Sequence, residues 1–98
     1  MEITKTESNG EVTLKLKGCL DTAATPQFAA AIEETAQAKA IVFDMSELEF
    51  IASSSLRLLV SAKKKRGAAF PMVLVGMNEV VRDVFDVTGL DEVFEIRT

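Results

Sequence analysis

The chain has 98 residues, a length that fits one domain around a single hydrophobic core, so residues 1–98 are expected to form one unit. Hydrophobic residues make up 48% of the chain and charged residues 27%, a balance typical of folded proteins and not of disordered ones. The formal net charge is −4, and because phosphate backbones attract basic proteins, nucleic acid is not an expected partner.

The residue types that the chain lacks narrow its chemistry. It contains no histidine, so catalytic triads and zinc sites that depend on imidazole cannot be assembled from it. The carboxylates Asp44, Glu47 and Glu49 are dispersed around a loop, and their spacing predicts neither an acid–base pair nor a metal cluster. We therefore expect no catalytic residue, no metal site and no cofactor, and a binding protein rather than an enzyme.

Two features concern the compartment and the membrane. Cys19 is the single cysteine, so it permits no internal disulfide and fits a reducing compartment, with the cytoplasm as the expected location. The first ten residues contain no continuous apolar stretch of signal-peptide length. The most apolar later segment, residues 70–77, falls far short of the roughly 20 residues needed to cross a bilayer, so no membrane insertion is expected.

The first predicted element is an antiparallel β-hairpin. Residues 11–16 alternate polar and apolar side chains, as a strand with one buried face does. Asn9-Gly10 lies between this segment and residues 3–8, and this pair readily takes the positive φ values that a tight two-residue turn requires.

A helix is predicted next. Thr25 fits the N-cap position, and Pro26 fits the first helical position, where a missing N–H removes no hydrogen bond. Phe28, Ile32 and Ala36 follow at helical spacing and mark the apolar face of this helix.

A strand–helix–strand unit is predicted for the middle of the chain. Residues 40–43 and 72–75 are short, nearly continuous apolar runs, typical of parallel strands that are covered on both faces. The helix between them is expected to end in the basic run 63–66 and Gly67, because cations complement the negative end of a helix dipole and glycine can terminate a helix. The apolar positions at helical spacing are Leu56, Leu59 and Val60.

The last predicted elements are a third helix and a short strand over residues 92–96. Asn78 fits the N-cap of this helix, and Gly89 lies near its end. The positions of its inward stripe are Val80, Val81, Val84, Phe85 and Thr88. Strands that alternate with helices predict an α/β domain, with a mixed, mostly parallel sheet opened by the N-terminal antiparallel hairpin and amphipathic helices packed on it.

Three consecutive serines, residues 53–55, stand between a strand region and the amphipathic helix. Serine is a favoured N-cap, because its hydroxyl accepts hydrogen bonds from the free N–H groups of the first helical turn, so at least one of the three is expected to act as a cap. The same N–H groups and the positive end of the helix dipole favour an anion. A phosphate on Ser54 would add about −1.5 to −2 charges beside Leu56.

With these residues the chain resembles the STAS family and, within it, the bacterial anti-sigma factor antagonists. The resemblance covers nearly the whole chain and depends on the order and spacing of short segments. These segments are Gly18-Cys19-Leu20-Asp21, residues 41–46, residues 48–51, Ser53-Ser54 with Leu56, and residues 85–90.

The resemblance implies a STAS-like domain over residues 1–98 and a partner-switching mechanism. An antagonist of this kind binds an anti-sigma factor that is also a serine kinase, which frees a sigma factor, and phosphorylation of the antagonist ends the binding. The modified residue is the second hydroxyl of an Asp-Ser-Ser-Gly-Leu-like segment, which corresponds to Ser54 here, with Ser53 as the alternative. The ATP belongs to the kinase, so the resemblance implies no nucleotide site in this chain.

The serine segment departs from that pattern, because Ala52 stands in place of the aspartate and Ser55 in place of the glycine. A second hypothesis therefore remains open, in which the chain is a STAS scaffold that is not phosphorylated, as a subunit of a lipid-transport ABC complex or of a signalling assembly. Asp21 either contacts the kinase or hydrogen-bonds the loop that follows it. The sequence predicts no oligomeric state. The residues expected to bind the partner are Asp21, Ser53, Ser54, Ser55 and Leu56.

Overall fold

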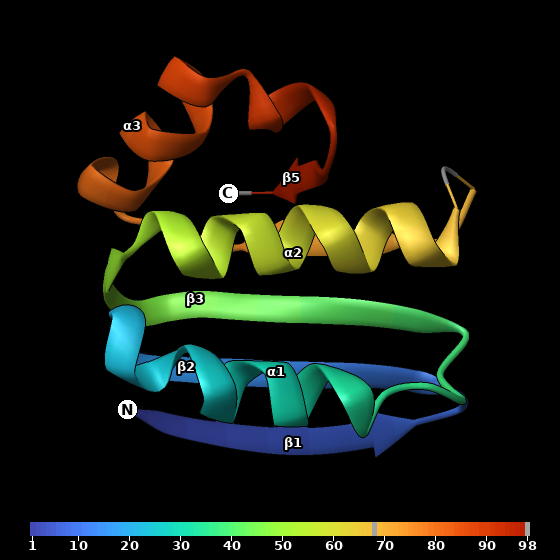
Figure 1. Ribbon diagram of the computed structural model, residues 1–98. Helices are drawn as coiled ribbons and strands as arrows, with labels where there is room; N and C mark the ends of the chain where they lie inside the picture. Colours follow the sequence, from blue (N-terminus) through green and yellow to red (C-terminus); the bar gives the residue numbers. More distant parts are fainter. Residues whose placement is uncertain (68, 98) are drawn as a thin grey trace.

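In the computed structural model, residues 1–67 and 69–97 form a five-stranded sheet and three α-helices (Figure 1). The strands are β1 (Glu2–Ser8), β2 (Glu11–Leu20), β3 (Ala40–Ile51), β4 (Met72–Val75) and β5 (Glu95–Arg97). The helices are α1 (Thr25–Glu33), α2 (Ser53–Arg66) and α3 (Glu79–Thr88), with 3-10 turns η1 (Thr22–Ala24) and η2 (Leu90–Glu92). The strands follow chain order across the sheet, with β1 antiparallel to β2 and the other neighbours parallel, which confirms the predicted α/β fold.

The predicted hairpin is confirmed by its turn and its register. Asn9 and Gly10 have φ values of 52° and 85°, the left-handed conformation that a tight hairpin turn requires of both central residues. The pairing runs from Ser8 opposite Glu11 to Glu2 opposite Lys17. Strand β2 is longer than predicted, since it continues past the paired part of β1 and ends at Leu20.

Strands β2 and β3 run parallel at the centre of the sheet and end together, with Leu20 opposite Ile51. Because each strand is followed by a helix, α1 and α2 begin at the same edge of the sheet and lie against one of its faces (Figure 1). The expectation that β3 is covered on both faces is wrong for its first half, since Ile41 and Phe43 are buried while Val42 remains partly exposed.

The core lies between the helices and this face of the sheet. Phe28 of α1 meets Phe43 of β3 edge to face, with 6.0 Å between the ring centroids. Phe85 of α3 meets Phe94 in the same geometry at 6.2 Å. One apolar cluster therefore joins the sheet to helices that come from both halves of the chain.

Helix α1 differs from its prediction at both ends. Thr25 is its first residue and not its N-cap, because the Thr25 hydroxyl forms hydrogen bonds outside the helix. The helix ends at Glu33, since the backbone then tightens into turns and the Thr35 hydroxyl donates to the carbonyl of Ile32 at 2.5 Å. Ala36 is therefore exposed and lies outside the helical face to which it was assigned.

The caps of α3 are those predicted. The Asn78 side chain accepts from the amide of Val81 at 2.8 Å and donates to the carbonyl of Leu48 at 3.1 Å, which ties the start of α3 to β3. Gly89 ends the helix in the left-handed conformation, with a φ of 75°. The predicted inward stripe was too wide, because Val80 is 60% exposed.

The last strand begins later than predicted. Residues 90–92 form the turn η2, in which the amide of Val93 donates to the carbonyl of Leu90 at 3.0 Å, so the chain becomes extended only in β5. Strand β5 pairs with β4 in parallel. Among the helices of the described residues, none combines the length and the hydropathy of a membrane span.

Arg66 connects the end of α2 to the loop that follows α1 through hydrogen bonds. Its guanidinium donates to the carbonyls of Thr35 at 3.0 Å, Ala36 at 3.2 Å and Ala38 at 2.6 Å. The same group lies 4.0 Å from the centroid of the Phe70 ring. These contacts need a planar group with several donors, which arginine has and lysine lacks.

Replacing Arg66 with lysine is expected to lower the free energy of unfolding by about 1–2 kcal/mol, because one ammonium cannot serve three carbonyls and the ring together. Urea unfolding followed by far-ultraviolet circular dichroism measures the change, since the chain has no tryptophan or tyrosine to report on it. Lys65→Arg is the control at the neighbouring exposed position and should leave the midpoint in place. An unchanged midpoint for Arg66→Lys would show that the guanidinium does not stabilise this loop.

Candidate functional site

The serine turn, defined as residues 52–55, joins β3 to α2. The amide of Ala52 donates to the carbonyl of Leu20 at 2.8 Å, so the hydrogen bonding between β2 and β3 continues up to the helix. Ala52 is extended and occupies the N-cap position, where it offers no side-chain hydrogen bond. The expectation that a serine caps this helix is therefore wrong, because all three serines already lie within its first turn.

The three serine side chains have different surroundings. Ser53 is exposed, Ser54 is half-buried and Ser55 is fully buried, with 0% of its surface accessible. Consecutive residues of an α-helix point about 100° apart, so three adjacent hydroxyls cannot share one direction. Only the first of them is presented openly to a partner.

The hydroxyl of Thr25 forms hydrogen bonds with the other two serines, Ser54 and Ser55. It donates to the carbonyl of Asp21 at 3.2 Å and lies 2.9 Å from the Ser54 hydroxyl oxygen and 3.1 Å from that of Ser55. A hydroxyl has one proton and two lone pairs, so the proton given to the Asp21 carbonyl leaves Thr25 to accept from both serines. The start of α1 is thereby joined to the start of α2.

The loop that begins at Asp21 lies beside the serine turn. The Asp21 carboxylate accepts from the amide of Ala24 at 2.9 Å and caps the turn η1, which is the local role considered for it. The Asp21 side chain is still exposed, and the backbone carbonyl of Asp21 accepts a hydrogen bond from the Thr25 hydroxyl. The structure therefore brings Asp21 and the serines to one end of the molecule.

The N-terminus of α2 has free hydrogen-bond donors. The amides of Ser55 and Leu56 both donate to the carbonyl of Ala52 at 3.1 Å. Those of Ser53 and Ser54 have no acceptor within residues 1–67 and 69–97. An uncapped helix N-terminus with an exposed hydroxyl is electrostatically suited to an anion on Ser53.

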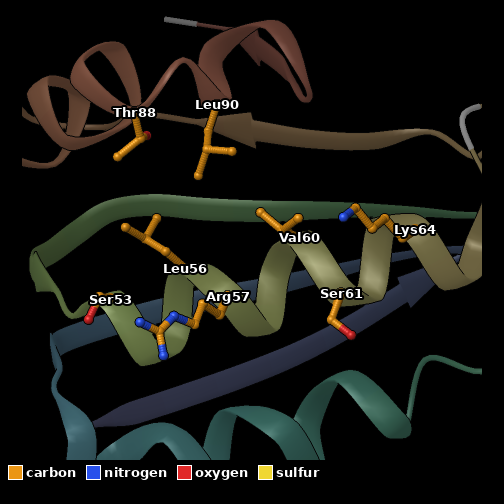
Figure 2. Close-up of a pocket in the computed structure, with 8 residues that line it drawn as sticks. All are labelled: Ser53, Leu56, Arg57, Val60, Ser61, Lys64, Thr88 and Leu90. Atoms are coloured by element: carbon orange, nitrogen blue, oxygen red, sulfur yellow. The ribbon is translucent and has the colours of Figure 1, made fainter.

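A groove of about 520 Å³ runs along α2 from Ser53 and separates this helix from Thr88 and Leu90 (Figure 2). Leu56, which was expected to contact the partner, is only 7% exposed and forms part of the lining of this groove. Ser55 supports the turn from beneath. Of the predicted binding residues, Asp21 and Ser53 are thus the most accessible.

The expectation that Asp44, Glu47 and Glu49 surround a loop is wrong, because all three lie within β3. Burial opposes ionisation of Asp44, but hydrogen bonds from Ser46 and the charge of Lys15 outweigh it, and the pKa of Asp44 is lowered. Glu47 pairs with Lys15 at 3.7 Å. In the part of the chain that the structure describes, no three side chains of the metal-binding types come together.

Thr25→Val is expected to lower the free energy of unfolding by about 1–3 kcal/mol, because the valine leaves the buried Ser55 hydroxyl without its acceptor. Thr25→Ser is the matched control, since it keeps the hydroxyl and loses only a methyl group. Chemical unfolding of both variants gives the comparison. Equal losses for valine and serine would show that the hydroxyl does not hold the two helices together.

Known proteins with a similar sequence or the same fold include several anti-sigma factor antagonists. The anti-sigma-F factor antagonist RsfB of Mycobacterium tuberculosis is 28% identical over 96 residues, which cover 96% of this chain and 79% of the relative. A solved anti-sigma factor antagonist from Mycobacterium paratuberculosis has a TM-score of 0.88 and 25% identity, over 97% of this chain and 83% of that one.

A further solved protein, the anti-sigma factor antagonist SpoIIAA, shares the fold in two forms. Its unphosphorylated form has a TM-score of 0.83 and 24% identity, over 99% of this chain and 89% of that one. The phosphorylated form, from Bacillus, has a TM-score of 0.75 and 22% identity, over 99% of this chain and 92% of that one. The family model for the STAS domain matches residues 2–98 of the sequence, and the chain therefore belongs to the STAS domain family.

Proposed function

We propose that this chain is an anti-sigma factor antagonist, a protein that binds an anti-sigma factor and thereby releases a sigma factor. The observation that carries the proposal is the serine turn, in which an exposed hydroxyl stands at an uncapped helix N-terminus. The name of RsfB, a relative that aligns over 96% of this chain, supports the same function. The chain acts by binding and carries out no reaction of its own.

Phosphorylation of the serine turn switches this binding off. A phosphate adds about −1.5 to −2 charges and three strong acceptors. The free amides of Ser53 and Ser54 and the helix dipole stabilise that charge, while a partner surface packed against neutral hydroxyls is expelled by it. The anti-sigma factor is itself the serine kinase and supplies the ATP.

Ser53 is the preferred phosphoacceptor within this proposal. Sequence resemblance pointed to Ser54, with Ser53 as the alternative, but the Ser54 hydroxyl is half-buried and its proton is engaged by Thr25. A kinase would have to break that hydrogen bond and turn the side chain outward. The Ser53 hydroxyl needs neither change, because it is exposed and forms no hydrogen bond among the described residues.

The second candidate is a constitutive STAS scaffold, in a lipid-transport ABC complex or a signalling assembly. Two observations favour it: Ala52 provides no acid beside the serines, and Thr25 fixes two of the three hydroxyls. In this alternative the same surface binds its partner permanently. The two functions differ in whether a kinase modifies the turn.

Incubation with the cognate anti-sigma factor and ATP is expected to add one phosphate, which mass spectrometry measures and assigns to a residue. Ser53→Ala should abolish the modification, and the neighbouring Ser54→Ala should retain it. Loss in Ser54→Ala with retention in Ser53→Ala would transfer the acceptor role to Ser54. An unmodified wild-type chain in the presence of an active kinase would contradict the switch and favour the scaffold.

A further inference from the structure

We propose that the groove between α2 and α3 binds an acidic amphipathic segment of the partner protein. The existence of a partner rests on the proposed function, while the chemistry of the segment is inferred from the groove itself. The groove measures about 520 Å³, and its lining combines apolar side chains with cations. The lining residues are Ser53, Leu56, Arg57, Val60, Ser61, Lys64, Thr88 and Leu90.

The apolar part of the groove lies between the two helical regions. Leu56 and Val60 point from α2 toward Leu90 on the other side (Figure 2). The α2 residues of the lining repeat at helical spacing from Ser53 to Lys64, a span of about 16 Å at 1.5 Å per residue. The groove therefore has the length of about three turns of a docked helix.

The charges of the groove have one sign. Arg57 and Lys64 are exposed, and neither forms an ion pair or a hydrogen bond within residues 1–67 and 69–97. No carboxylate belongs to the lining, although the whole chain carries a net charge of −4. The helix dipole accounts for Lys64 in the last turn of α2, but it does not account for Arg57, the fifth residue of the helix.

These cations select the occupant by charge complementarity. Arg57 and Lys64 are seven residues apart, which corresponds to about 10.5 Å along α2. A partner helix that lies along the groove matches them with two carboxylates spaced seven residues apart, and its apolar side chains contact Leu56 and Val60. A basic or purely apolar segment would lack this complementarity.

The groove and the serine turn are adjacent. Ser53 lies at one end of the lining, four residues before Arg57, and the Arg57 side chain extends along α2 toward Ser53 (Figure 2). A phosphate on Ser53 would pair with Arg57 across one helical turn and withdraw that cation from the partner's carboxylates. Phosphorylation of the turn would thus weaken binding in the groove as well as at the turn.

The test uses the full chain labelled with ¹⁵N and two synthetic helical peptides. Both peptides carry a leucine face, and they differ only in having glutamates or lysines seven residues apart. The acidic peptide is expected to shift the amide resonances of Leu56, Val60 and Leu90, and the basic peptide to leave them in place. Equal shifts with both peptides, or none with the acidic peptide at millimolar concentration, would overturn the proposal.

Charge-reversal variants test the role of the two cations. The double variant Arg57→Glu/Lys64→Glu is expected to lower the affinity for the acidic peptide by about tenfold. Lys5→Glu/Lys17→Glu changes the net charge equally on the hairpin and is expected to leave the affinity within about twofold, because screening removes most of its long-range effect. An equal loss of affinity in both double variants would show that net charge alone causes the effect. It would overturn the proposal that Arg57 and Lys64 contact the acidic segment.

Ser53→Glu tests the connection to the serine turn. This variant is expected to bind the acidic peptide more weakly than the wild type, and unchanged binding would overturn the coupling between Ser53 and the groove. No anti-sigma factor is present in these titrations. Failure of the groove proposal can therefore be distinguished from failure of the proposed function, which is tested by phosphorylation of the wild-type chain.

Discussion

The parallel pairing of β2 with β3 is the constraint on which the site depends. The two strands end together, and the hydrogen bond from the Ala52 amide to the Leu20 carbonyl continues their pairing into the serine turn. Both following helices consequently start at one edge of the sheet. The Thr25 hydroxyl then joins them by accepting from two serines, so the position of the turn is fixed by the sheet and by α1 together.

This arrangement divides three chemically identical side chains into two roles. Ser54 and Ser55 use their protons to hold the helix starts together, while Ser53 remains exposed on the first turn of α2. An accessible hydroxyl beside two hydrogen-bonded ones suits a switch, because a new charge on the surface changes what can bind without disturbing the core. The adjacent groove extends that surface along α2 and adds two cations to it.

Much of the fold could be predicted because its signals are local. Asn9-Gly10 specifies its turn by backbone conformation, and Asn78 specifies the start of α3 by its side chain. The serine turn was also located correctly, since three hydroxyls before an amphipathic pattern mark a helix start. The helix boundaries around Thr25 and the late start of β5 were missed because tertiary hydrogen bonds and a 3-10 turn determine them. The separate environments of the serines depend on a contact between residues 25 and 54, which no local pattern contains.

In the proposed function, an exposed serine at an uncapped helix start controls partner binding. Isothermal titration calorimetry of the cognate anti-sigma factor against the chain, before and after quantitative phosphorylation of Ser53, measures this control. The phosphate is expected to weaken the affinity by at least about tenfold, through lost contacts at the turn and repulsion of the partner. Equal dissociation constants for the two forms would contradict it.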